Sequence, residues 1–452
     1  MKNIVISTSL LLLLGGCAQN VPTHEEATRS LKNGENTSSA PGQFRNSRNS
    51  RKVQDGWIKT FHDRKLNALV REAQKNNPTL KIAASRVERS VALTKLTESA
   101  LKPNVNMTGY YRENNAEGAR EIGFGGFGIS WEPDVWGRVA NETRAQEALT
   151  AAQAADFNFA RQSLAANTAK AWFLLNTNAK IYDFSREVVR LQEKGLKILD
   201  AREKIGQGNK RDVHVSRALV ADAEESARAA LAAKERAQRA LEVLVGRYPS
   251  ANIHAGSLDK VPPRIPNGLP SQLLERRPDL IAAQERVAAA FHQKTATELL
   301  HLPNVNLRLS LGPNSINDAI SSLAGGVLAP VYTGGAIEAQ IEVATADQKA
   351  AIAHYAATAL RAFKEVENAL AAEKHLSARL GHVETMVKEY HTAYKMTVET
   401  YRIGESSVLD ILLIQSQWIT AEMKRMQVMK QRLINRVNLH LALGGSFKRS
   451  KH

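Results

Sequence analysis

Few side chains in this sequence are spaced for catalysis. Glu298 and His301 have the Glu-x-x-His spacing that di-iron helix bundles use, but such a site needs two of these pairs and two further glutamates. The sequence holds no second pair, and Pro303 follows closely, so capping or packing explains the two residues better. The 12 histidines form no H-E-x-x-H zinc motif, and there is no G-x-S-x-G motif of serine hydrolases. We therefore expect no enzyme, no metal site and no cofactor.

A glycine-rich stretch at residues 123–128 fits the G-x-G-x-x-G pattern of dinucleotide sites. In those sites a helix follows the glycines, and its N-terminus receives the phosphates. Here the next residues are Ile129, Ser130 and Trp131, then Glu132 and Pro133, which do not open a helix. The stretch therefore predicts a strand of alternating glycines and aromatic residues.

Cys17 is the only cysteine, so no disulfide can form within the chain. An apolar run at residues 4–14 follows Lys2 and has the length of a secretory signal, too short to span a bilayer. It ends in Leu-Gly-Gly before Cys17, which resembles the lipobox of bacterial lipoproteins. We predict a signal peptide at residues 1–16 and lipid attachment at Cys17, with a plain secretory signal as the alternative. Ala18 in place of aspartate resembles lipoproteins that are sorted to the outer membrane.

The formal net charge of +16 is strongly basic. Such a balance fits nucleic acid, anionic lipid or anionic cargo, and export past the inner membrane argues against nucleic acid. Residues 20–54 are rich in Ser, Asn and Gly and lack apolar periodicity. Residues 17–56 are therefore predicted to form a flexible tether between the lipid and the folded body.

One structural unit occurs twice in the sequence. Residues 103–106 read PNVN and recur at residues 303–306, an offset of 200. The offset then drifts to 197, where Pro133 and Gly137 match Pro330 and Gly334, and to 198, where residues 241–246 align with residues 439–444. We predict two repeats at residues 57–250 and 271–445, a linker at residues 251–270 and a basic tail at residues 446–452.

Each repeat is predicted to begin with a helix and a β-hairpin. Helical stretches at residues 63–101 and 271–302 stop at Pro103 and Pro303. Two-residue alternation follows, which predicts hairpins at about residues 104–132 and 304–332. In the second hairpin the alternation covers only residues 305–311 before Gly312 and Pro313, and the return strand is expected at about residues 323–332.

Long helices are predicted after glycine turns at Gly137 and at Gly334 with Gly335. Heptad spacing predicts that these helices approach their neighbours closely. The patterns run to residues 205 and 403, about 100 Å of helix each, and last helices follow at residues 212–245 and 409–443. The heptad positions are Ala145, Ala148, Ala152, Ala155, Phe159, Ala166, Ala169 and Phe173 in the first copy, and Ala336, Ala339, Val343, Ala346, Ala350, Ala353, Ala357 and Leu360 in the second.

The two hairpins indicate a membrane barrel built by several chains. Their strands have one lipid-compatible face, and an exported, lipidated chain can place such strands in an outer membrane. Four strands cannot close alone, whereas three copies would supply twelve strands, an even number. The expected fold is mainly α-helical with a small transmembrane β part.

Five local sequences carry a family resemblance, namely LLERRPDLIAAQERVAAA at residues 273–290, HLPNVNL at 301–307, APVYTGG at 329–335, YRIGESSVLD at 401–410 and LALGG at 441–445. In this order they resemble the TolC-like outer membrane factor family, most closely its lipoprotein branch of NodT type. The resemblance covers about residues 57–445. It implies a homotrimer, with a 12-stranded barrel in the outer membrane of a Gram-negative bacterium and a helical tunnel that extends into the periplasm.

The same resemblance implies a gate at the far helical turns, where polar links hold the tunnel closed. The matching positions are Asp212, Tyr401 and Asp410. We hypothesise that contacts between Asp212 and Tyr401 contribute to the closed state and that Asp410 rings the aperture and favours cations. Ser406 and Leu413 stand where some relatives carry an arginine and a second acidic residue. The polar contacts that close the tunnel are therefore expected to be weaker or to involve other residues. Simple helix N-terminal caps are an equal alternative for Asp212 and Asp410.

The predicted function is a passive outer-membrane conduit in a tripartite efflux system. Its implied partners are a periplasmic adaptor, an inner-membrane pump of the RND type and outer-membrane lipids. Two alternatives remain at this point: an outer-membrane channel for type I protein secretion, and a periplasmic coiled-coil lipoprotein that acts as a scaffold without a pore. The paired hairpins favour the conduit, because a scaffold has no need of alternating strands.

Overall fold

The computed structural model describes residues 44–45, 56–114, 119–257, 276–314 and 318–445. The predicted signal peptide, Cys17, most of the tether, most of the linker and the basic tail lie outside the described residues. The chain divides into two compact units. Among the described residues, unit 1 comprises 93–149 and 284–353, and unit 2 comprises 44–92, 150–283 and 354–445. Each unit therefore takes segments from both sequence repeats.

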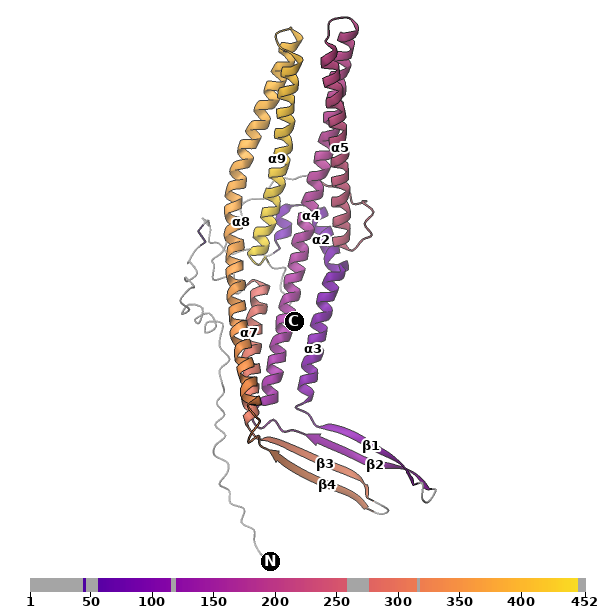
Figure 1. Cartoon of the computed structure of the whole chain (residues 1–452), viewed down its shortest axis with the longest axis vertical. Coiled ribbons are helices and arrows are strands. Elements are labelled where there is room, and N and C mark those ends of the chain that lie inside the picture. Colours follow the sequence, from indigo (N-terminus) through magenta and orange to yellow (C-terminus); the bar gives the residue numbers. More distant parts are fainter. Residues whose placement is uncertain (1–43, 46–55, 115–118, 258–275, 315–317, 446–452) are drawn as a thin grey trace, which may run out of the picture. The chain divides into compact units, whose positions relative to one another are not determined.

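Unit 1 contains one antiparallel sheet of the four described strands in the order β1-β2-β3-β4. The strands are β1 (Asn104–Asn114), β2 (Ala119–Trp131), β3 (Asn304–Asn314) and β4 (Asp318–Leu328). β1 and β2 form the hairpin of the first repeat, and β3 and β4 form that of the second (Figure 1). β2 and β3 pair only from Phe127 to Trp131 with Leu307 to Leu311, which joins the two hairpins near their bases.

Unit 2 is helical. Its helices include α2 (Arg64–Asn76), α5 (Lys210–Val245) and α9 (Val408–Ala442), and it holds the larger part of α4 (Arg138–Lys204) and α8 (Ala336–Arg402). α4 and α8 have 67 residues each, about 100 Å of helix. The largest apolar core of unit 2 surrounds Trp172 and Leu175 of α4 and includes Leu66, Leu241 and Val437 from three other helices. Among the described helices, none combines the length and the apolarity needed to cross a membrane.

The first helix of each repeat differs from the prediction. The helix expected at residues 63–101 is divided into α2 and α3 (Pro78–Ser99). Asn77 between them is extended, with ψ 123°, because the proline ring at Pro78 disfavours a helical conformation in the preceding residue. In the second repeat α7 (Pro278–Glu298) ends in the 3-10 turn η2 (Leu299–His301).

In the second hairpin, strand β3 extends beyond the alternating residues 305–311. β3 continues through Gly312 and Pro313 to Asn314 and pairs with β4 over its whole length. Its pairing with β2 ends at Leu311. Beyond that point β3 has one unpaired side, so a proline without an N–H group is tolerated. The return strand β4 ends at Leu328, four residues before the predicted end, and Pro330 lies in the following loop.

The two heptad patterns have different outcomes. Most positions of the first pattern are buried within the chain, among them Ala152, Ala166 and Phe173. All eight positions of the second pattern are exposed, from Ala336 to Leu360. The physical reason is that no other helix of the described chain covers this face of α8. We call these eight residues the α8 stripe.

In both repeats an equivalent hydrogen bond fixes the start of a helix. Asn77, directly before Pro78, donates a hydrogen bond from Nδ2 to the carbonyl of Leu244 at 2.9 Å. Arg277, directly before Pro278, donates from Nη1 to the carbonyl of Ala442 at 3.1 Å. Leu244 and Ala442 are separated by the same offset of 198 that relates the helix ends. In both repeats the residue before the proline is thus bound to the last turn of the last helix.

Candidate functional site

The sheet of unit 1 has one continuous apolar face. In antiparallel strands, directly opposed residues project from the same face. Val105 opposes Ile129, Phe127 opposes Leu311, and Leu309 opposes Leu323. These rows extend across all four strands, and Val105 is 60% exposed while Leu323 is 76% exposed. The apolar sheet face consists of Val105, Met107, Phe127, Ile129, Trp131, Val305, Leu307, Leu309, Leu311, Leu323 and Val327.

The opposite face is polar or small. Asn106 opposes Gly128, Ser130 opposes Arg308, and Asn306 opposes Gly326. Among the described side chains, this face carries one large apolar residue, Leu328. It lies at the end of β4 and pairs with Asn304. The glycine-rich stretch at residues 123–128 lies in β2, as the sequence predicts. A sheet of this kind separates an apolar surrounding from an aqueous one.

Two tryptophans hold the junction between strands and helices. Trp131 donates from Nε1 to the carbonyl of Leu101 at 3.0 Å, and Trp136 donates from Nε1 to the carbonyl of Pro303 at 2.6 Å. The predicted turn glycines lie here. Gly137 has φ 78° directly before α4, and Gly334 and Gly335 have φ 64° and 84° directly before α8. These are left-handed conformations that glycine adopts without steric cost.

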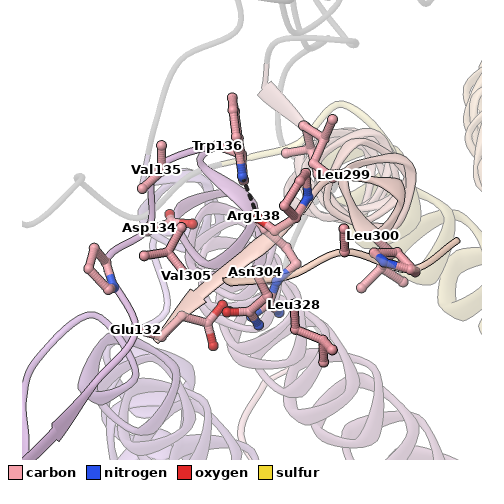
Figure 2. Close-up of a pocket in the computed structure, with 15 residues that line it drawn as sticks. Glu132, Asp134, Val135, Trp136, Arg138, Leu299, Leu300, Asn304, Val305 and Leu328 are labelled. Atoms are coloured by element: carbon pink, nitrogen blue, oxygen red, sulfur yellow. Dashed lines mark hydrogen bonds and ion pairs between the residues drawn. The ribbon is translucent and has the colours of Figure 1, made fainter. Parts of the chain in front are cut away.

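A pocket of about 290 Å³ lies at this junction. Figure 2 shows its lining, with Leu299, Leu300 and Leu328 on one side, Val135 and Val305 on the other, and Trp136 at the top of the view. Its charged groups are already bonded. Arg138 forms ion pairs with Glu132 at 2.7 Å and with Glu142 at 2.9 Å, and the carboxylate of Asp134 accepts the N–H groups of residues 139 and 140. The pocket therefore offers an apolar lining and no free catalytic group.

The far turns carry the predicted gate residues, and two of these residues have local roles. Asp410 belongs to a capping box with Ser407, whose N–H donates to its carboxylate at 2.8 Å. The hydrogen bonds from the Ser407 backbone and hydroxyl hold the pKa of Asp410 below its ordinary value. Asp212 lies in the first turn of α5, where Asn209 is the N-cap, and its carboxylate is 3.3 Å from Nε of Arg211.

Tyr401 forms a contact between the two repeats at this end. Nη1 of Arg202 donates a hydrogen bond to the Tyr401 hydroxyl. The guanidinium carbon also lies 4.8 Å from the centre of the Tyr401 ring, which is within the range of a cation–π interaction. Arg202 is in the last turn of α4, and Tyr401 is in the last turn of α8. We call this pair the tip latch.

Sequence reasoning missed Arg202. At the offset of 198 it aligns with Thr400, and Tyr401 aligns with Glu203, so comparison of the repeats gives no signal for this pair. The described contacts of Asp212 and Tyr401 do not include one between them, and that contact stays a prediction. In the described part of the chain no group of three or more His, Cys, Asp or Glu residues could hold a metal ion. Glu298 forms an ion pair with Lys294 at 3.4 Å.

Comparison with known proteins identifies the family. The family model described as outer membrane efflux protein matches residues 69–247 and 269–445, once in each repeat. The chain belongs to the outer membrane efflux protein family. This membership accounts for the duplicated architecture and for the placement of strands and long helices in one chain.

Members of this family resemble the chain over nearly its full length. The toluene efflux pump outer membrane protein TtgC of Pseudomonas putida is 26% identical over 478 residues, which cover 99% of this chain and 96% of that protein. The probable outer membrane lipoprotein SilC of Salmonella typhimurium is 24% identical, with 98% of each chain covered. The open state of the MtrE outer membrane channel of Neisseria gonorrhoeae is similar in structure, with a TM-score of 0.83, 26% identity and coverage of 90% of this chain and 96% of that one. These three names describe outer-membrane and efflux proteins, and none describes an enzyme.

Proposed function

We propose that this protein is the outer-membrane channel of a tripartite efflux system, a passive conduit rather than an enzyme. The observation that carries the proposal is the apolar sheet face, which spans four strands of 11, 13, 11 and 11 residues. A strand that crosses an outer membrane needs about 9 to 11 residues. Each strand is long enough, and the polar sheet face on the other side suits the lumen of a water-filled channel.

A homotrimer is the assembly that suits this sheet. In the described sheet β1 and β4 each pair on one side only, and an open edge cannot stay unpaired in lipid. Three copies would pair β1 of one chain with β4 of the next and close a barrel of twelve strands. The exposed α8 stripe supports the same assembly, because small apolar residues at heptad spacing favour close contact with a helix of another copy.

The proposed setting is the outer membrane of a Gram-negative bacterium, with a lipid anchor at Cys17 and the helices in the periplasm. The partners would be a periplasmic adaptor and an inner-membrane pump of the RND type, which would deliver the cargo. Efflux is favoured over type I protein secretion by the names of the relatives, since TtgC is described as an efflux pump component. The lipid anchor is supported by the resemblance to SilC, which is described as a probable lipoprotein.

The proposed gate lies at the turns between α4 and α5 and between α8 and α9. The tip latch of Arg202 and Tyr401 would keep the two repeats together in the closed state. Asp212 and Asp410 would add negative charge at the same end and favour cations. Asp410 keeps its charge to lower pH than an ordinary aspartate, because Ser407 holds its pKa down.

Conductance in planar lipid bilayers tests the channel. The purified full-length, lipidated protein should produce discrete single-channel steps, and a heat-denatured sample of the same preparation is the control. Under cross-linking in cells, the same protein should be recovered with an adaptor and a pump. Absence of conductance from folded, trimeric protein would leave the scaffold alternative.

A further inference from the structure

The polar sheet face carries an arginine, Arg308 of β3 (Figure 1). Its side chain is exposed, and it opposes Ser130 of β2 and Ala324 of β4. Leu307 and Leu309 on either side of it belong to the apolar sheet face, because successive strand residues project from opposite faces. Among the strand residues whose side chains are described, Arg308 is the single charged one. These residues are 104–109, 126–131, 304–311 and 323–328.

The surroundings of Arg308 leave its guanidinium free to meet a solute. Among the described residues, none forms an ion pair with it. The neighbouring positions on the same face are small, and they include Gly128 and Gly326. A Cβ placed at either glycine would meet no heavy atom within 4 Å. The sheet surface beside Arg308 is therefore low and open, and no described carboxylate neutralises its charge.

The polarity of the two faces decides which side of the sheet meets lipid. An arginine on the lipid face of a transmembrane strand is destabilising, most of all near the middle of the bilayer. In a water-filled lumen the same side chain keeps its hydration. The row of Val305, Leu307, Leu309 and Leu311 on the other face of β3 suits lipid. Arg308 is thus directed to the lumen of the proposed barrel.

We propose that Arg308 forms an anion-binding ring inside the barrel and that the cargo includes organic anions with carboxylate or phosphate groups. The inference rests on the proposed trimeric channel, in which three copies bring three Arg308 side chains to one level. Arginine suits such cargo, because its planar guanidinium donates two parallel hydrogen bonds to a carboxylate or a phosphate. The small residues around it leave room for the cargo to approach.

The range of this charge matches the size of the lumen. Twelve strands about 4.8 Å apart and tilted by about 40° give a backbone radius of about 12 Å. The Debye length is about 10 Å at 0.1 M salt and about 3 Å at 1 M. The field of three arginines therefore extends across the lumen at the lower salt concentration and stays close to the side chains at the higher one. Anion preference should weaken accordingly as salt rises.

Ion permeability in planar bilayers tests the ring. Because Asp212 and Asp410 are proposed to favour cations at the gate, the readout is the change that Arg308→Gln causes, whatever the sign of the wild-type preference. In a KCl gradient at about 0.1 M, this variant of the full-length, lipidated protein should lower the chloride-to-potassium permeability ratio at least about two-fold. The change should be small at about 1 M salt, where the charge is screened.

Two further variants separate the ring from a general effect of charge. Arg308→Lys keeps the charge and should keep most of the wild-type ratio. Lys65→Gln is the matched control, because it removes the same charge from an exposed residue of α2, outside the sheet. An equal ratio in Arg308→Gln and the wild type, or an equal change in Lys65→Gln, would overturn the ring and leave the channel intact. Absence of conductance in the wild type would instead contradict the proposed function, and the ring with it.

Citrate provides a second readout, which reports on binding. Three arginines hold this polyvalent anion more strongly than chloride, so citrate should lower the single-channel conductance of the wild type and have little effect on Arg308→Gln. Arg308→Asn, with the side chain found two positions earlier at Asn306, serves if the glutamine variant does not assemble. Citrate block of equal strength in the wild type and the variant would place the anion site elsewhere and overturn the proposal.

Discussion

Single residues at the far turns divide into those with a local role and those that connect the repeats. Asp410 is the N3 residue of a capping box whose N-cap is Ser407, so its described hydrogen bonds are local. Arg202 and Tyr401 form a contact between the last turns of α4 and α8. The pair interacts through a hydrogen bond and a cation–π contact, and the hypothesised contact between Asp212 and Tyr401 stays a prediction. Gating predictions therefore belong to Arg202 and Tyr401.

We expect Arg202→Gln combined with Tyr401→Phe to raise single-channel conductance several-fold in planar bilayers. The double substitution removes the charge over the ring and the hydroxyl that accepts the hydrogen bond, so the ends of α4 and α8 lose their link. Arg402→Gln is the matched control, because Arg402 pairs only with Glu399 on its own helix among the described contacts. Equal conductance in the double variant and the wild type would exclude the latch.

Stability at acidic pH should depend on His440. Burial, followed by the nearby Arg436 charge, lowers its pKa from 6.5 to about 3. The unfolded chain binds a proton near pH 6.5 while the folded chain does not, so the stability that neutral His440 contributes is complete above that pH. It is lost as the pH falls toward 3, by about 1.4 kcal/mol per pH unit.

The measurement compares wild type with His440→Phe, which keeps a ring against Trp57 and removes the titration. From pH 7 to pH 5 the unfolding temperature of the wild type should fall more than that of the variant. Carboxylates that titrate in the same range affect both proteins alike, so the difference between the two isolates His440. Parallel pH profiles would contradict the low pKa.

At the level of elements, the sequence predicted the ranges of the long helices well. It gave less information where the end of an element depends on pairing with a distant strand. The long helices α4 and α8 and the last helices α5 and α9 agree with the predicted ranges within about three residues. The break at Asn77 was missed, because a proline is compatible with both a kink and a new helix start. The alternation at residues 305–311 gave no signal that β3 continues to Asn314. Whether Pro313 ends a strand depends on which of its sides is paired, and that is decided by the distant strand β2.

Arg277 and Asn77 precede equivalent helices in the two repeats, but Arg277 forms ion pairs whereas Asn77 forms neutral hydrogen bonds. Arg277 is 3% exposed at its side chain and pairs with Asp279 at 2.7 Å and Glu365 at 2.8 Å. Arg277→Ala leaves both carboxylates without this partner and should cost about 3–5 kcal/mol. Asn77→Ala removes neutral hydrogen bonds and should cost about 1–3 kcal/mol.

Unfolding of the two variants by heat or denaturant, in the same detergent as the wild type, measures the difference. Arg277→Lys separates charge from geometry, because lysine keeps the charge but cannot form two parallel hydrogen bonds to Asp279. It should recover only part of the loss. A smaller effect of Arg277→Ala than of Asn77→Ala would contradict this assignment.

At the level of the whole molecule, the surface left uncovered by one chain indicates the assembly. The α8 stripe contains Val343 at 63% and Leu360 at 59% exposure, and six alanines accompany them. In water such a stripe favours contact with another helix. In unit 1 the free edges of β1 and β4 likewise favour pairing with strands of another chain. The proposed partner, another copy of the chain, would satisfy both features.

Ala350→Glu should therefore convert the proposed trimer to smaller species without unfolding the chain. The side chain is exposed in the single chain, so the glutamate meets solvent there and is buried only in the assembly. Gln340→Glu, at an exposed position of α8 outside the stripe, is the control. Light scattering in detergent gives the oligomeric state, and circular dichroism shows whether helix content is kept. A stable trimer of Ala350→Glu would exclude the stripe as an interface.

The sequence by itself determined the order of elements, the duplication and the two faces of the sheet. These follow from local periods of 3.6 and 2 residues and from proline and glycine positions, which act over a few neighbours. Only the tertiary structure decided that Arg202 contacts Tyr401, that Phe44 and Trp57 are buried, and that one heptad pattern is buried while the other stays exposed. Each of these features depends on which segment, distant in the sequence, packs against a given surface. The sequence pattern of α4 resembles that of α8, and only the surrounding helices distinguish a core from an interface.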